Sequence, residues 1–166
     1  LLTLKGGNAL KLLGITKRQS QDLDFSIAES KRLDKKIHGP IFFEAISTSF
    51  SNLGYKIINF KFEHRPSKRG EHTPPFWGGY SVTFTIISEE VFQQLNDTQK
   101  KNPGAYAESI ENSQKKICID LSFDEITDDR LQYNHDGIDI FIYSPMMIVD
   151  EKIRATCQQP VSYTHL

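Results

Sequence analysis

The sequence predicts one α+β domain, a mixed β-sheet flanked by helices. Segments in which apolar and polar residues alternate with a period of two, typical of strands, are interspersed with segments of helical spacing. The predicted elements follow the order β-α-β-α-β-β-α-β-β-α, which favours α+β architecture. With 166 residues, of which 38% are apolar and 11% aromatic, the chain has the length of one domain and enough apolar surface to bury a core.

The first half of the chain contributes two predicted strands and two predicted helices. Residues 1–4 are mostly apolar and are expected to form the first strand. Asn8 is a residue type that caps helices and Gly14 one that ends them, so a short helix is predicted between them. Residues 22–27 alternate cleanly and predict a strand with one acidic face. Residues 40–53 have helical spacing and predict the second helix.

The middle of the chain is expected to form a hairpin followed by helices. Residues 55–64 and 80–87 both alternate, and the Pro- and Gly-rich segment between them favours an open hairpin. From residue 88 to 113 the spacing becomes helical. Pro103, in an Asn-Pro-Gly sequence, is expected to break this stretch into two helices, since proline cannot donate the helical hydrogen bond.

The last third of the chain returns to strands and ends in a helix. Residues 116–123 alternate and predict a strand. Asn-His-Asp-Gly at residues 134–137 is typical of a turn, and residues 138–143 predict a further strand. Pro145 suits the first turn of a helix, which is predicted over residues 146–159.

The composition excludes several classes of protein. Lys and Arg number 20 against 21 Asp and Glu, a formal net charge of −1, so the surface lacks the strong positive field of a dedicated nucleic-acid-binding protein. The two cysteines, Cys118 and Cys157, are far apart and have no zinc-ligand spacing. The sequence contains neither a signal peptide nor an apolar run long enough to span a membrane, which predicts a cytoplasmic protein with no membrane partner.

The domain is expected to cover residues 1–159 and to be incomplete at both ends. The sequence has no initiator Met, it opens on an apolar stretch, and its last helical pattern stops abruptly at Gln158-Gln159-Pro160. Residues 160–166 are interpreted as a non-native tail and are excluded from the fold prediction.

Three aspartates form the candidate metal site. Asp22 and Asp24 are two residues apart on a predicted strand, so their side chains project from the same face with Cα atoms roughly 6 to 7 Å apart. Asp120 is the acid embedded in a strand pattern whose opposite face is wholly apolar. Oxygen ligands suit a hard divalent cation, and three carboxylates would complete a clamp for Mg²⁺ or Mn²⁺.

A glycine pair precedes this acidic strand. Gly6-Gly7 before a helix start offers free backbone N–H groups that can seat a triphosphate. The pair is followed in order by the basic Arg18, the hydroxylic Ser20 and the Asp-Leu-Asp sequence. This order is much more specific than the glycine pair alone.

Several stretches resemble a known family. KGGNAL at residues 5–10 with RQSQDLDF at residues 18–25 resembles the opening motif of the AbiEii/AbiGii-type nucleotidyltransferases, toxins of abortive-infection toxin–antitoxin systems. SPMMIVDEKIRA at residues 144–155 is similar to that family's lysine-bearing helix, and ICIDLSF at residues 117–123 to its third-acid strand.

The resemblance implies a polymerase-beta-like nucleotidyltransferase core that moves a nucleoside monophosphate from an NTP to an acceptor with a divalent metal. In some relatives that acceptor is the end of a tRNA, and a cognate antitoxin is the implied protein partner. Roles are implied for the following residues: metal binding and catalysis for Asp22, Asp24 and Asp120, contact with the nucleotide's phosphates for Lys152, phosphate binding for Gly6 and Gly7, and the lining of the nucleotide pocket for Arg18 and Ser20.

Each assignment has a simpler alternative. The Asp-x-Asp pair can be the solvated face of a strand, Asp120 an ordinary polar edge residue, and Lys152 part of the exposed face of an amphipathic helix. At the level of function, the alternatives are a truncated or degenerate module that binds nucleotide or an antitoxin without catalysis, and a metal-dependent nuclease.

Overall fold

The computed structural model of the protein describes residues 2–18, 20, 22–28, 33–66, 78–110 and 114–158. The strands are β1 (Leu2–Lys5), β2 (Leu23–Ala28), β3 (Tyr55–Arg65), β4 (Gly79–Ser88), β5 (Lys116–Glu125), β6 (Leu131–His135) and β7 (Ile138–Ile142). The helices are α1 (Gly6–Leu12), α2 (Lys35–Ser51), α3 (Glu89–Gln94), α4 (Asp97–Lys100), the 3₁₀ helix η1 (Pro103–Tyr106) and α5 (Pro145–Gln158). The predicted tail, residues 160–166, lies outside the described residues.

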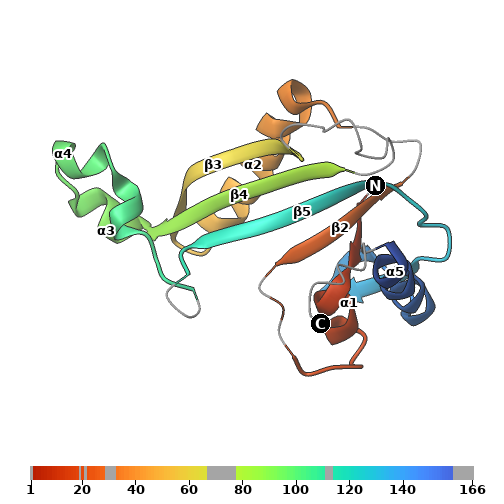
Figure 1. Cartoon of the computed structure of the whole chain (residues 1–166). Helices are drawn as coiled ribbons and strands as arrows, with labels where there is room; N and C mark the ends of the chain where they lie inside the picture. The colour runs from red at the N-terminus through yellow and green to blue at the C-terminus, as the bar shows by residue number, and fades with distance from the viewer. Residues whose placement is uncertain are drawn as a thin grey trace, which may run out of the picture.

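Within the described residues the strands form one seven-stranded sheet in the order β3-β4-β5-β2-β1-β7-β6. β2 pairs with β5 in parallel, as β1 does with β7, and the other neighbours are antiparallel. Figure 1 shows β3, β4 and β5 as a long ribbon with α2 beside it, whereas α1 and α5 gather at the other side of β2. The predicted α+β architecture with a mixed sheet is thereby confirmed.

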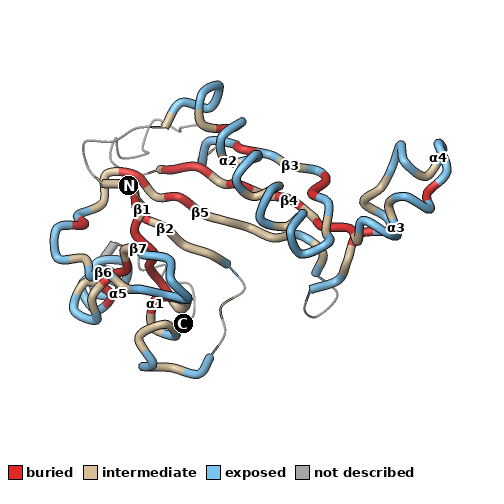
Figure 2. Tube along the Cα trace, turned by 180° about the vertical axis from the view of Figure 1, so that it is seen from behind, coloured by how far each residue is buried: buried red, intermediate tan, exposed pale blue. Residues whose placement is uncertain are grey.

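The main core lies between α2 and one face of the sheet. Phe42 and Phe50 of α2 pack against Phe62 of β3 and Phe84 of β4, with ring centroids 5.3 and 5.5 Å apart. Leu121 of β5 is 1% exposed in this cluster, and the buried positions follow β4 in Figure 2. Because side chains alternate between faces, the polar residues of β2 and β5 point away from this core.

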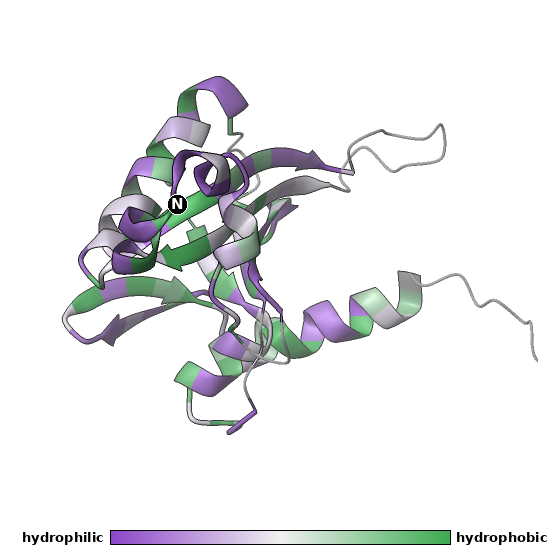
Figure 3. Cartoon of the chain, turned by 90° about the vertical axis from the view of Figure 1, so that its left-hand side faces the viewer, coloured by the Kyte–Doolittle hydropathy of each residue, from purple (hydrophilic) through white to green (hydrophobic). Residues whose placement is uncertain are grey.

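A second core attaches the terminal helices to the sheet. Ala9 of α1 and Ile148 of α5 pack with Leu4 of β1 and Ile142 of β7, all nearly or fully buried. In Figure 3, α5 carries bands of hydrophobic and hydrophilic residues. This core holds β1 and α5 together, although they lie near opposite ends of the sequence.

Helix α2 begins earlier than the predicted start at residue 40. Asp34 is its N-cap, and the carboxylate accepts hydrogen bonds from the amides of Lys36 and Ile37 at 2.7 and 3.1 Å. Pro40 therefore lies inside the helix, where it cannot donate to the carbonyl of Lys36. Lys36 is exposed to solvent, which can satisfy that carbonyl.

The predicted pair of helices over residues 88–113 was wrong in both halves, as far as the described residues show; residues 111–113 lie outside them. The structure has three short pieces, α3, α4 and η1, and residues 107–110 are not helical. Asn96 forms a capping box with Gln99, which starts a new helix after an extended Leu95. Burial of Leu95 and Ala107 against Ile87 is the tertiary contact that breaks the helical run.

The predicted turn at residues 134–137 is confirmed, and it belongs to a hairpin that the sequence did not predict in full. Gly137 donates its amide hydrogen to the Asn134 side chain at 3.1 Å, with Gly137 at φ +83°. The preceding strand β6 was missed because most of its residues are polar and exposed. Pairing with β7 decides its conformation.

No helix in the described ranges is long and apolar enough to cross a membrane.

Replacing Gly79 by Ala should lower the free energy of unfolding by about 3 kcal/mol or more. A Cβ at Gly79 would lie 1.9 Å from the carbonyl oxygen of Leu121, so the β4 and β5 backbones would have to separate. Urea denaturation followed by circular dichroism measures the change.

The matched control is Gly39→Ala in α2. A Cβ there would meet the Phe62 side chain at an ordinary 3.8 Å, and alanine favours the helix, so stability should rise by about 0.5 to 1 kcal/mol. Equal effects of the two substitutions would contradict the assigned strand contact.

Candidate active site

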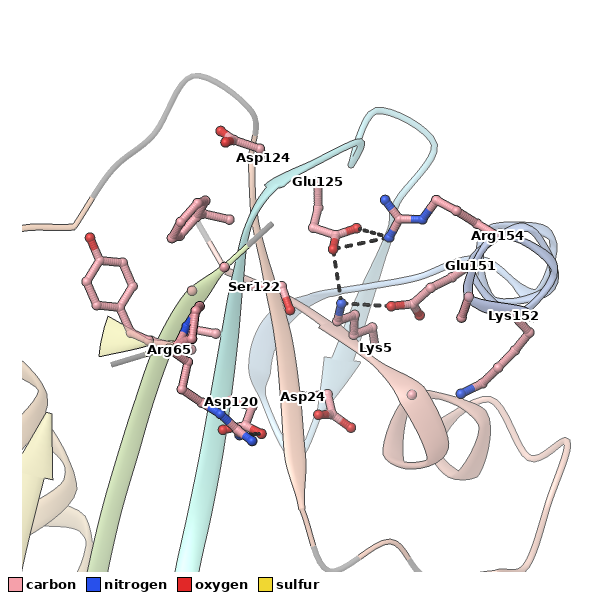
Figure 4. Close-up of a pocket in the computed structure, with 18 residues that line it drawn as sticks. Lys5, Asp24, Arg65, Asp120, Ser122, Asp124, Glu125, Glu151, Lys152 and Arg154 are labelled. Carbon is pink, nitrogen blue, oxygen red and sulfur yellow. Dashed lines mark hydrogen bonds and ion pairs between the residues drawn. The ribbon is translucent and has the colours of Figure 1, made fainter. Parts of the chain in front are cut away.

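The register of β2 against β5 places two acidic residues side by side. Asp24 and Asp120 are direct partners in this parallel pair. Adjacent strands lie about 4.8 Å apart and paired residues project to the same face, so the two carboxylates share one patch of the sheet. Their neighbours Phe25 and Leu121 belong to the core under α2, so the two acids lie on the opposite face. Figure 4 shows both acids on neighbouring strands.

The third predicted acid, Asp22, is less closely associated. It precedes β2 and is exposed to solvent. Its charge still acts on the site, since it contributes to raising the pKa of Asp24. Among the described residues, no three His, Cys, Asp or Glu side chains converge closely enough to hold a metal ion.

Asp24 is the acid whose ionisation the fold disfavours. Burial raises the pKa of Asp24, Lys5 opposes this rise, and the charges of Asp120, Asp22 and Glu151 add to it. No hydrogen bond or ion pair from another described residue reaches its carboxylate. A negative charge at this position is therefore poorly compensated by the protein itself.

These features fit a hard divalent cation. Mg²⁺ and Mn²⁺ take oxygen ligands, and Asp24 and Asp120 offer them from neighbouring strands. A cation would also offset the cost of ionising a half-buried Asp24 beside other acids. The donor set consists of two adjacent carboxylates with Asp22 further out.

Asp24 and Asp120 lie at the wall of a cavity of about 590 Å³. Four of the predicted residues line it, each from a different element: Gly6 from α1, Asp24 from β2, Asp120 from β5 and Lys152 from α5. The other lining residues are Lys5, Arg65, Pro66, Gly78, Gly79, Tyr80, Leu121, Ser122, Phe123, Asp124, Glu125, Glu151, Arg154 and Ala155. The cavity wall is thus rich in both acidic and basic side chains.

Gly6 lies directly against the acidic pair. Its φ is +69°, and a Cβ at this position would be 2.8 Å from Oδ2 of Asp24. A glycine is therefore required both by the backbone conformation and by the space that the carboxylate occupies. Helix α1 begins at Gly6, with Lys5 at the N-cap position, so the predicted cap at Asn8 was wrong.

The remaining predicted nucleotide-binding residues, Gly7, Arg18 and Ser20, do not line the cavity. A Cβ at Gly7 would be 3.0 Å from the Cβ of Ser20, so the two residues pack together. Asn8 donates hydrogen bonds to the carbonyls of Ser20 and Asp22 at 3.3 and 2.8 Å, which fixes the approach to β2. Arg18 is exposed to solvent.

A buried lysine network that sequence reasoning missed borders the acids. Lys5 is 7% exposed, and its ammonium group bonds Glu151 at 2.7 Å and Glu125 at 3.4 Å. Arg154 reaches the same Glu125 at 3.0 Å, as the dashed lines in Figure 4 show. Lys5 is the register partner of Asp24 in the β1–β2 pair, so the two side chains lie on the same face. The sequence pattern alone does not identify this neighbour.

Arg65 also contacts the acid pair, and the sequence analysis did not predict this contact. Its Nη1 donates to Oδ2 of Asp120 and forms an ion pair with it. This hydrogen bond and the charge of Asp120 raise the pKa of Arg65. The second oxygen of Asp120 accepts a hydrogen bond from the Cys118 thiol at 3.4 Å.

The chain was compared with curated proteins and with models of protein families. No curated protein matches the chain. The model of a family described as "Nucleotidyl transferase AbiEii toxin, Type IV TA system" matches residues 1–165. Since this match covers essentially the whole sequence and agrees with the mixed sheet and its polar cavity, the chain belongs to the AbiEii family of nucleotidyl transferase toxins of type IV toxin–antitoxin systems.

Proposed function

We propose that the protein transfers a nucleoside monophosphate from an NTP to an acceptor hydroxyl and depends on a divalent cation, Mg²⁺ or Mn²⁺. The observation that carries this proposal is the direct pairing of Asp24 with Asp120 at the wall of a cavity that also contains basic side chains. Membership of a nucleotidyl transferase family supports the same reaction class.

Asp24 and Asp120 would hold the cation, and Asp22 would contribute charge from the start of the strand. When bound, the cation neutralises charge on the pyrophosphate leaving group and lowers the pKa of the acceptor hydroxyl. Lys5 is buried and paired with Glu125 and Glu151, and its role would be to balance the charge next to Asp24.

The nucleotide would lie in the cavity with its phosphates near Lys152. This lysine is exposed on α5 and lines the cavity, so its ammonium group is free to bind phosphate oxygens. Gly6 would present backbone to the phosphates at close range. Gly7, Arg18 and Ser20 would support the nucleotide from the segment that Asn8 ties to β2.

We further propose that the acceptor is an RNA, with the end of a tRNA as the first candidate, and that the reaction takes place in the cytoplasm. A type IV toxin–antitoxin family implies a cognate antitoxin as the protein that opposes this activity. Defence by abortive infection is the biological role that this pairing favours.

Asp24→Asn and Asp120→Asn should each reduce transfer by roughly a thousandfold, because each removes a negatively charged cation ligand that is worth several kcal/mol to the transition state. The assay incubates the protein with labelled NTPs, Mg²⁺ and total RNA and measures pyrophosphate release and labelled RNA. Asp128→Asn, at an exposed turn outside the cavity, is the matched control and should retain full activity.

Other results of this assay would identify the alternatives. Nucleotide binding without pyrophosphate release, for every NTP, would indicate a binding module without catalysis. Shortening of the RNA would indicate a nuclease. Full transfer by either Asn variant would contradict the assignment of the acids.

In metal-free buffer, Asp24→Asn should make the protein more stable at pH 7. Burial and the neighbouring acids raise the pKa of Asp24 above its usual value of 3.8. The folded state then holds this proton more tightly than the unfolded state, so stability falls as pH rises from 3.8 through the raised pKa. Urea unfolding between about pH 3 and pH 8 should show the two proteins converging at the acidic end and diverging above it.

Addition of Mg²⁺ should raise the melting temperature of the unmodified protein and leave that of Asp24→Asn nearly unchanged, because a ligand that binds only the folded state stabilises it. Differential scanning calorimetry with and without EDTA measures both. Equal stabilisation of the two proteins would place the cation elsewhere.

A further inference from the structure

Two cationic side chains flank the acid pair, and they are held very differently. Lys5 is buried and bonded to two glutamates. The side chain of Arg65 is 60% exposed, and Asp120 is its ion-pair partner among the described residues. Of the two, Arg65 is the one that can leave its carboxylate without stranding a buried charge.

The route that Arg65 takes to Asp120 crosses a neighbouring strand. Arg65 ends β3 and is in register with Gly79 of β4, which is in turn in register with Ser122 of β5. Paired residues project to the same face of a sheet, and the guanidinium of Arg65 reaches Asp120 on this face, as Figure 4 shows. Arg65, Gly79, Asp120 and Ser122 all line the cavity.

This contact occupies one of the two oxygens with which Asp120 could bind a cation. Arg65 bonds Oδ2 of Asp120, and Cys118 donates to Oδ1. A divalent cation and a guanidinium are both positive, so they compete for the same carboxylate. Removal of Arg65 from Asp120 would leave a planar fork of N–H donors in the cavity, a geometry that matches phosphate oxygens.

We propose that Arg65 is an exchangeable counter-ion of the site. Without a divalent cation it neutralises Asp120, and when the cation binds Asp120 the guanidinium moves to the phosphates of the nucleotide in the same cavity. The inference rests on the proposed function, since it requires both a cation and a nucleotide. It adds Arg65 to the nucleotide-binding residues, and the contact of Arg65 with the nucleotide requires that a cation is already bound at Asp24 and Asp120.

The first test measures Mn²⁺ binding by isothermal titration calorimetry in the absence of nucleotide. Arg65→Gln should bind Mn²⁺ about two- to fivefold more tightly than the unmodified protein, the effect of losing one exposed ion pair. The matched control is Arg154→Gln, which removes a positive charge from the same cavity but from Glu125. It should leave the affinity within about twofold, because it does not compete for Asp120.

The second test measures binding of a non-hydrolysable NTP analogue at saturating Mn²⁺. Here Arg65→Gln should bind about tenfold more weakly, since a charge-assisted hydrogen bond to phosphate is lost. Arg65→Lys, which keeps the charge but not the fork, should bind Mn²⁺ like the unmodified protein and the analogue with intermediate affinity. A purely structural role for Arg65 would not change the two affinities in opposite directions.

The outcomes separate this inference from the function on which it rests. Equal Mn²⁺ affinities of the unmodified protein and Arg65→Gln, or unchanged binding of the analogue, would refute the exchange and leave the proposed reaction standing. If neither protein bound Mn²⁺ at all, the metal site itself would fail, and the exchange with it.

Discussion

The site depends on the parallel register between β2 and β5. That register sets Asp24 beside Asp120 and, on the other face, Phe25 beside Leu121. A slip of β2 by one residue against β5 would turn Asp24 toward the core and Phe25 away from it, at a large cost in free energy. The packing of α2 against the sheet therefore maintains the acid pair, although no residue of α2 lines the cavity.

Charge balance is the second constraint on the arrangement. The acids of β5 form ion pairs with cations from other elements. Asp120 pairs with Arg65 of β3, and Glu125 pairs with Lys5 of β1 and Arg154 of α5. Lys5 joins β1 to Glu125 at the end of β5 and to Glu151 in α5. Loss of Lys5 would remove the ion-pair partner of Glu151 among the described residues, so Lys5 helps to fix how α5, and with it Lys152, approaches the sheet.

Residue patterns predicted the regular parts of the fold, because a strand or helix with one buried face has a period that can be read locally. The strands around Phe25, Phe84 and Leu121 were found in this way. The errors fall where local signals compete with distant contacts. Helical spacing predicted a helix from residue 40, yet Asp34 caps a helix that begins at Lys35. Burial of Leu95 and Ala107 interrupts another stretch of helical spacing.

By itself, the sequence determined which residues share a face, the acidic character of the β2 strand and the motif order that marks the family. The tertiary structure decided which strands are neighbours, and hence that Asp24 meets Asp120, that Arg65 reaches the acid pair and that Lys5 lies between two glutamates. Arg65 and Asp120 are 55 residues apart, and Lys5 and Glu151 are 146 apart. A period of two specifies the side of a strand on which a residue lies, but it carries no information on the strand beside it.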